Sequence, residues 1–228
     1  MHNIQKWSRR SRRGVEIWKS PDGIKTRGSV IIKNCRIFEN LWNGIAISKS
    51  GGNKGELTNI TIYNNIIDNN RINEPYDKHG TGIDIRRTTN IIIKNNIITN
   101  HPISQNIGGG IYLSDCKKTT IEKNNITKNG LGIKIWSNYK DIIPNYTIKN
   151  NNFIKNKIQA EFYYRFPQGL LEKTTWNQNY WDNHHNKQKI KTILGYLAIL
   201  NKKYTILAII PYLDFDKQPA EKPYNIKI

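Results

Sequence analysis

Apolar and polar positions alternate in two short phrases that recur along most of the chain. The first phrase is a small residue followed by Ile-x-Ile or a close variant, and its copies begin at Gly14, Gly44, Gly82, Gly110, Gly132 and, in a decayed form, Gln159. The second phrase places a large apolar residue five positions after an isoleucine, as in Ile32/Ile37, Ile62/Ile67, Ile93/Ile98, Ile121/Ile126 and Ile148/Phe153. Residues at i and i+2 point to the same side of a strand, so both phrases predict short strands with one buried face.

Two polar columns repeat in step with the second phrase. Three positions after its first isoleucine stand Cys35, Asn65, Asn96, Asn124 and Asn151, and eight positions after it stand Asn40, Asn70, His101, Asn129 and Asn156. Asparagine tolerates the left-handed backbone of tight turns. Asparagines stacked on one another can also form a ladder of side-chain hydrogen bonds, which explains the repetition of one residue type.

The spacing of the phrases predicts a parallel β-helix. The shortest complete repeat runs 22 residues from Gly110 to Gly132, and the others are longer because of insertions at 49–58, 71–81, 102–109 and 138–145. Repeats of this length with three short strands each are typical of β-solenoids. We therefore predict an all-β fold, a single-chain parallel β-helix of about six coils. A leucine-rich horseshoe would need more leucine, and a propeller blade needs about 40 residues with antiparallel hairpins.

The same phrases resemble a known group of proteins. Asn-Asn-Ile and Gly-Ile-x-Ile are similar to the repeats of right-handed parallel β-helix proteins with the pectin-lyase-like fold, and above all to the NosD-like family. The phrase from Trp176 to Trp181, WNQNYW, resembles the Asn-Tyr-Trp closure after the last coil of those proteins, and residues 211–226 resemble their C-terminal ending. The resemblance covers roughly residues 14–226. It implies the fold, and it implies export or display at the cell surface if the N-terminus is truncated.

The ends of the repeat region suggest three segments. We expect a basic N-terminal segment at 1–13, the β-helix at 14–175, and a C-terminal cap and tail at 176–228, with the aromatic residues at 176–181 covering the last coil. No comparable cap precedes Gly14. We therefore expect either a fragment of a longer β-helix or self-association through the uncapped first coil.

Composition narrows the function classes. The chain has 40 Ile and 31 Asn among 228 residues, a combination that disfavours helical bundles, and its two cysteines exclude a disulfide scaffold or a Cys-rich zinc module. The formal charge of +19 favours a polyanion as the binding partner. However, nothing resembles a nucleic-acid module, and Lys, Asn, Ile and Tyr together are typical of an AT-rich genome. No signal peptide is visible, and the two apolar runs at 193–200 and 204–210 are each too short to span a bilayer.

The strongest candidate for catalysis lies on the outward side of the Gly-Ile-x-Ile strands. Pectin-lyase-like enzymes use arginine, lysine or paired carboxylates on the flank of the helix, and the resemblance implies the same chemistry here. Asp84 and Asp77 are the candidate carboxylates, His79 or Arg86 the proton-transfer group, and Arg87 a clamp for a substrate carboxylate. The reaction would be that of a polysaccharide lyase or glycoside hydrolase on an acidic glycan. Ordinary solvated strand residues would give the same pattern.

The other reading is a carbohydrate-binding or structural surface protein without catalysis. The candidate ligand-binding residues are Trp18, Tyr112, Lys134, Trp136 and Arg87, because flat rings stack on sugars and charged neighbours fix hydroxyls or carboxylates. The expected partner is a polysaccharide, neutral or anionic. We expect no cofactor and no metal site, since copper prefers Cys, Met and His together, and these residues are few and scattered here.

Overall fold

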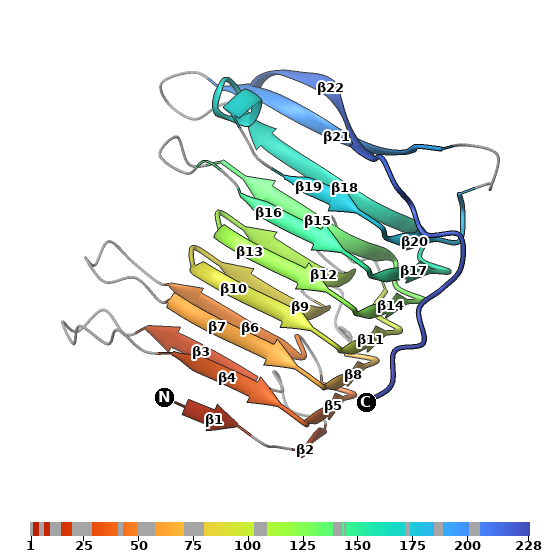
Figure 1. The fold of residues 1–228 in the computed structure, drawn as a ribbon. Coiled ribbons are helices and arrows are strands. Elements are labelled where there is room, and N and C mark those ends of the chain that lie inside the picture. The colour runs from red at the N-terminus through yellow and green to blue at the C-terminus, as the bar shows by residue number, and fades with distance from the viewer. Residues whose placement is uncertain are drawn as a thin grey trace.

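β-Strand is the main regular secondary structure in the described part of the chain, which contains no α-helix (Figure 1). The structure, a computed structural model, describes residues 2–4, 7–9, 15–19, 29–40, 43–49, 58–70, 80–102, 109–138, 143, 145–171, 174–184, 189–200 and 206–228. Side chains are described for fewer of these: those before residue 29 and those of 49, 168 and 169 are left out. No helix in this described part is long and apolar enough to cross a bilayer.

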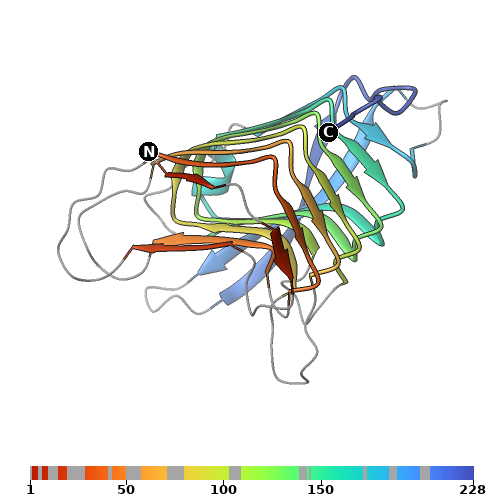
Figure 2. The same ribbon diagram turned by 90° about the horizontal axis from the view of Figure 1, so that it is seen from below.

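Three columns of parallel strands form the walls of a solenoid, which Figure 2 shows along its axis. The first wall contains β1 (His2–Ile4), β4 (Val30–Lys33), β7 (Thr58–Tyr63), β10 (Thr89–Lys94), β13 (Lys117–Glu122), β16 (Tyr146–Lys149) and β19 (Thr175–Asn177). The second wall contains β2 (Trp7–Arg9), β5 (Arg36–Phe38), β8 (Ile66–Asp68), β11 (Ile97–Thr99), β14 (Asn125–Thr127), β17 (Asn152–Ile154) and β20 (Tyr180–Trp181). The third wall contains β3 (Val15–Lys19), β6 (Ile45–Lys49), β9 (Thr81–Arg86), β12 (Gly109–Ser114), β15 (Leu131–Ser137), β18 (Ile158–Arg165) and β21 (Lys191–Leu200).

The C-terminal end joins the first and third walls. Strand β22 (Ile206–Asp216) pairs antiparallel with β21 and reaches β19 through Asp216 and Trp176, so the two walls form one 15-stranded sheet. A short 3-10 helix, η1 (Gln168–Leu171), follows β18.

The three walls of parallel strands confirm the parallel β-helix predicted from the repeat. Its number of turns differs a little from the expected six.

The core is a stack of isoleucines inside the walls. The inward positions of both phrases, including Ile32, Ile62, Ile93, Ile83 and Ile111, are at most 1% exposed. In the first wall the residues between them are partly or fully exposed, which gives the alternating burial expected for a strand with one solvated face.

Glycine recurs at the start of the Gly-Ile-x-Ile phrase because the next coil fills the space of a side chain. A Cβ added at Gly82 would lie 2.7 Å from the carbonyl oxygen of Gly110, and one added at Gly110 would lie 2.7 Å from that of Gly132. The ladder side chains His101 and Asn129 would be 2.9 and 3.0 Å away. Any larger residue would push the coils apart.

The first polar column forms a continuous ladder at the corner between the first and second walls. Each side-chain oxygen accepts from the backbone N–H one coil earlier, through Asn65, Asn96, Asn124, Asn151 and Asn179, at 2.9–3.1 Å. Each Nδ2 also donates to buried carbonyls, as Asn65 does to Ile32 and Tyr63 at 3.0 Å. The ladder thus satisfies backbone groups that a corner would leave unpaired.

The residue that adopts the left-handed backbone is not the ladder residue but the one before it. Asn34, Asn64, Asn95, Lys123, Asn150 and Gln178 have φ between 51° and 56°. Turn and ladder therefore use neighbouring positions, which explains the Asn-Asn pairs of the repeat.

The ladder ends on a carboxylate. Asp216 is 0% exposed and accepts hydrogen bonds from the N–H groups of Gln178, Asn179 and Gln218, from Asn179 Nδ2, and from Trp181 Nε1, at 2.9–3.2 Å. All five partners are donors, so a group that only accepts fits here. The rings of Phe153 and Trp181 stack at 4.2 Å beside it and close the core.

The second ladder contains one histidine. The Nδ2 of Asn70 lies 3.1 Å from His101 Nε2, and His101 Nδ1 lies 3.0 Å from Asn129 Oδ1. Since Asn129 Oδ1 can only accept, Nδ1 carries the proton and Nε2 accepts from Asn70. Burial lowers the pKa of His101 to about 4.

The three predicted segments are not separated in the sheets. Strands β1 and β2, within residues 1–13, pair with β4 and β5, and β19 to β21 continue the three walls past residue 175. The C-terminal tail runs along the second wall, where Tyr224 and Asn152 exchange two hydrogen bonds of 2.8 Å (Figure 1).

Replacing His101 by asparagine should remove a pH-dependent part of the stability. The folded pKa lies near 4 and the unfolded value near 6.5, so the neutral ring stabilises fully above pH 6.5 and the contribution falls as the pH drops towards 4. Over this pH range the free energy of unfolding falls by about 3 kcal/mol. Between pH 7.5 and 4, the free energy of unfolding measured with urea should change less with pH in H101N than in wild type, because asparagine keeps the ladder without titrating. The same pH dependence in both proteins would contradict this assignment.

Replacing Asp216 by alanine should destabilise the C-terminal end severely. Five donors would lose their buried acceptor, at a cost of about 3 kcal/mol or more in the free energy of unfolding. Thermal and urea unfolding measure this loss. Glu221→Ala, which removes an exposed acid from the same tail, is the matched control and should leave stability unchanged.

Candidate functional site

Two outward columns of the third wall bring most of the candidate residues together. One column contains Ala46, Asp84, Tyr112, Lys134 and Glu161, and the neighbouring column contains Ser48, Arg86, Ser114, Trp136 and Tyr163. We call these two columns the outer face. Parallel strands in exact register stack equivalent positions of successive repeats, so residues about 22–40 positions apart become neighbours.

The outer face points away from the core, as predicted, but it is not solvated as we expected. Asp84, Tyr112, Lys134, Ser114 and Tyr163 are only 5–8% exposed. These side chains have low exposure because they pack against one another: charged groups pair along the columns, and aromatic rings lie over or beside them. This contrasts with the partly exposed outward positions of the first wall.

The carboxylate of Asp84 is held by two neighbours. Arg86 Nε and Nη2 donate to Asp84 Oδ1 and Oδ2, both at 2.8 Å, and Asn43 Nδ2 donates to Oδ2 at 3.1 Å. Burial lowers the pKa of Arg86, but its hydrogen bonds and attraction to Asp84 outweigh this, so the pKa lies above its ordinary value. The guanidinium carbon also lies 5.2 Å from the centre of the Tyr112 ring. The pair forms a fixed ionic unit rather than a free carboxylate.

Lys134, Trp136 and Tyr163 form a second unit on the same face. The rings of Trp136 and Tyr163 stack with centroids 4.0 Å apart and an angle of 4°. The ammonium of Lys134 lies 5.8 Å from the centre of the Trp136 ring and 3.7 Å from a Glu161 carboxylate oxygen. Trp136 itself is half-buried, so part of its indole reaches the surface.

Two buried polar atoms near this stack lack hydrogen-bond partners among the described residues. They are Tyr163 Oη and Asn138 Oδ1. Asn138 directly follows β15 and stands two positions after Trp136. Burial raises the pKa of Tyr163, which keeps its hydroxyl protonated as a donor. One donor within the stack and one acceptor just after β15 are therefore unsatisfied.

The remaining candidates are placed differently. Asp77, His79 and the side chain of Trp18 lie outside the described residues. Arg87 is exposed in the corner after β9, where its φ is 54°, and its N–H donates to Ser114 O at 2.8 Å. The catalytic roles of Asp84, Arg86, Asp77 and His79 stay predictions.

Sequence reasoning did not single out Tyr163 or Asn138 as site residues. The signal for Tyr163 was available, since it follows Trp136 in the same column. No sequence signal singled out Asn138. A recess of about 380 Å³ at another corner was also missed; it is lined by Asp68, Asn69, Asn100, Pro102 and Lys128.

The described residues contain no group of three or more His, Cys, Asp or Glu side chains that could hold a metal ion. Both cysteines are buried and free. The Sγ of Cys116 lies 3.4 Å from the carbonyl oxygens of Ile85 and Ser114, and burial raises its pKa to about 12. Such a thiol stays protonated and is a poor metal ligand.

Comparison with known proteins identifies the family. The model of the NosD family, described as "Periplasmic copper-binding protein (NosD)", matches residues 2–191. The chain belongs to the NosD family. The resemblance of the repeats to the NosD-like family is thereby confirmed, and the NosD match covers all three walls from β1 to the start of β21. No curated protein and no solved structure matches the chain.

A double-mutant cycle on Asp84 and Arg86 should reveal a structural ion pair. Each single alanine variant leaves a charge without its partner, and the Asp84 side chain is 6% exposed whereas that of Arg86 is 31% exposed. We therefore expect the free energy of unfolding to fall by about 3 kcal/mol for Arg86→Ala and by less for Asp84→Ala. The double variant should be more stable than the sum of the single losses predicts. Additive losses would contradict the pairing. Assays of the same variants on polyuronides test the predicted catalytic role separately.

Proposed function

We propose that this NosD-family solenoid binds carbohydrate on the outer face, with the Trp136–Tyr163 stack as its platform. The observation that carries the proposal is the pairing of this stack with the unsatisfied Tyr163 hydroxyl and Asn138 amide oxygen. A sugar offers apolar C–H faces for stacking and hydroxyl groups that both donate and accept. That combination matches the half-buried indole of Trp136 together with the donor of Tyr163 and the acceptor of Asn138, which a ligand would reach once these side chains turn towards it.

The second face of the Trp136 indole supports the same proposal. Tyr163 covers one face of the ring, and the next residue along the column on the other side is Ser114. The Ser114 hydroxyl donates to Asp115 Oδ2 at 3.0 Å, so this small side chain turns away to its neighbour. A sugar ring is a chemically suitable partner for the indole on this side.

Charge pairing favours a neutral glycan over an acidic one. Arg86 is paired with Asp84, and Lys134 is within 3.7 Å of Glu161, so each cation of the face already has a carboxylate. A sugar carboxylate would have to displace one of them. Binding is also better supported than proton transfer, because both oxygens of Asp84 accept hydrogen bonds from Arg86 and Asn43.

The copper named in the family description does not carry over to the described residues of this chain. Copper prefers Cys, Met and His ligands in one cluster. Here His101 is held inside the second ladder, and the two cysteines are buried in separate columns. We therefore propose no copper chemistry for the described part of the solenoid.

Truncating the indole should weaken binding of neutral oligosaccharides. We expect Trp136→Ala to lower affinity by about tenfold or more, through loss of stacking area, and Tyr163→Phe to lower it less, through loss of one hydroxyl. Glycan arrays followed by calorimetry on the positive ligands measure both effects.

The matched control is Tyr63→Ala, a half-buried aromatic residue on the first wall under Lys94. It should leave binding unchanged. Binding that survives Trp136→Ala, or that falls equally with Tyr63→Ala, would refute the outer face as the site.

A further inference from the structure

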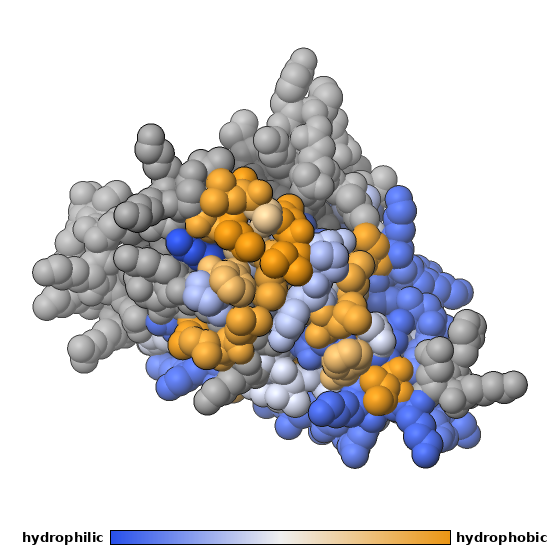
Figure 3. Space-filling view, turned by 90° about the horizontal axis from the view of Figure 1, so that it is seen from above, coloured by the Kyte–Doolittle hydropathy of each residue, from blue (hydrophilic) through white to orange (hydrophobic). Residues whose placement is uncertain are grey.

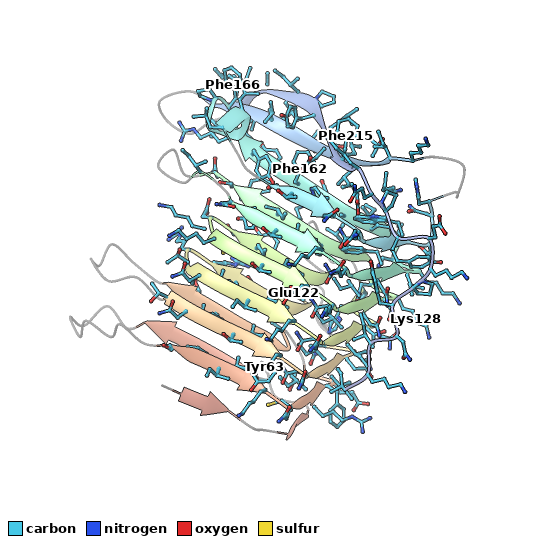
Figure 4. The ribbon with its side chains drawn as sticks, viewed as in Figure 1. Tyr63, Glu122, Lys128, Phe162, Phe166 and Phe215 are labelled. Atoms are coloured by element: carbon cyan, nitrogen blue, oxygen red, sulfur yellow. The ribbon has the colours of Figure 1, made fainter. Side chains whose placement is uncertain are left out.

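The C-terminal hairpin of β21 and β22 exposes more apolar surface than any other described segment. Figure 3 looks onto this end and shows apolar side chains gathered there, and Figure 4 marks Phe166 and Phe215 at the same end. The large apolar residues of the hairpin that are 40–64% exposed are Leu194, Ile206, Leu207, Ile209, Ile210, Leu213 and Phe215. Contiguous apolar patches of this kind mark contact surfaces.

Part of the hairpin is exposed on both of its faces. In β21 the adjacent residues Leu197 and Ala198 are buried, so both faces of that strand are covered there. Their partners in β22, Ile210 and Ile209, are also adjacent and point to opposite faces, yet they are 43% and 52% exposed. We call Ile206–Ile210 the apolar segment. A partner must cover both faces to bury it.

The outer edge of β22 is poorly suited to pairing with another strand. Among the described residues, β22 has a neighbour on this edge only at Asp216. Pro211 lies in the middle of the strand, opposite Tyr196, and has no N–H to donate. Proline on an edge strand disfavours edge-to-edge association.

The charge of the chain favours an anionic surface over a second copy of the chain as the partner. The apolar segment contains no ionisable residue, while the whole chain carries a formal charge of +19. Exposed Lys189 and Lys217 lie at the end of the hairpin away from Ile206, and Arg165 of β18 lies beside Ala198 of β21, the residue opposite Ile209. A second copy of the chain would bring +19 against +19, whereas an anionic surface would be attracted.

We propose that the apolar segment Ile206–Ile210 inserts into the interfacial region of a bilayer that contains anionic lipid. Lipid surrounds an inserted segment and so covers both faces at once, and the free backbone edge stays at the level of the polar headgroups. The positive charge of the chain attracts it to the anionic headgroups. The solenoid lies on the membrane and does not cross it.

Vesicle flotation with the full chain tests this proposal. We expect the protein to float with phosphatidylcholine vesicles that contain about 30% phosphatidylglycerol, and to float less with pure phosphatidylcholine or at high salt. The triple variant Leu207→Thr, Ile209→Thr, Ile210→Thr should lower the partition coefficient by about tenfold or more, because apolar area is lost while strand propensity is kept.

The control is Ile92→Thr. Ile92 is 40% exposed on the first wall and its column neighbours are Thr61 and Thr120, so this change should leave both fold and flotation unaltered. Absence of flotation with anionic vesicles, or flotation of the triple variant like wild type, would overturn the proposal. A dimer in sedimentation that the triple variant loses, without vesicle binding, would make a second copy the occupant instead.

Discussion

The structure depends on satisfying backbone hydrogen-bonding groups at the corners of a solenoid. Strands pair with the coils above and below, but the turns between walls would bury unpaired N–H and C=O groups. The asparagine ladders solve this, since one amide side chain accepts from the coil below and donates to carbonyls of its own and neighbouring coils. Regular stacking then places isoleucine on isoleucine through the core.

The variations within each ladder follow the same constraint. Asp216 ends the first ladder because four neighbouring residues direct five donor groups at it, and a carboxylate needs no donor partner of its own to satisfy. His101 replaces asparagine in the second ladder because a neutral ring offers one donor and one acceptor at similar reach. That substitution makes the core sensitive to acid, which an asparagine would not.

The function we propose rests on residues that this constraint leaves free. Outward positions of the third wall contribute nothing to the ladders, so they vary from coil to coil and bring Asp84, Tyr112, Lys134 and Trp136 onto one face. Charged pairs fix part of that face, and the aromatic stack with its unsatisfied polar atoms marks where a ligand would complete it. At the C-terminal end, the strand that caps the core extends past it and exposes Ile209 and Ile210.

The sequence alone determined the fold, its register and its family, because equivalent positions of stacked coils have the same surroundings and therefore need the same type of residue. Isoleucines five apart, the glycines before Ile-x-Ile and the asparagine columns each have one location in the solenoid. Only the tertiary structure decided how the outward residues interact: that Asp84 is bound by Arg86 and Asn43, that Tyr163 stacks on Trp136, and that the side-chain oxygen of Asn138 is buried without a hydrogen bond. These facts depend on lateral contacts between coils and on side-chain directions, which no repeat period encodes. The exposure of Ile206–Ile210 could not be predicted for the same reason, since an apolar strand has the same sequence pattern whether or not a core lies beneath it.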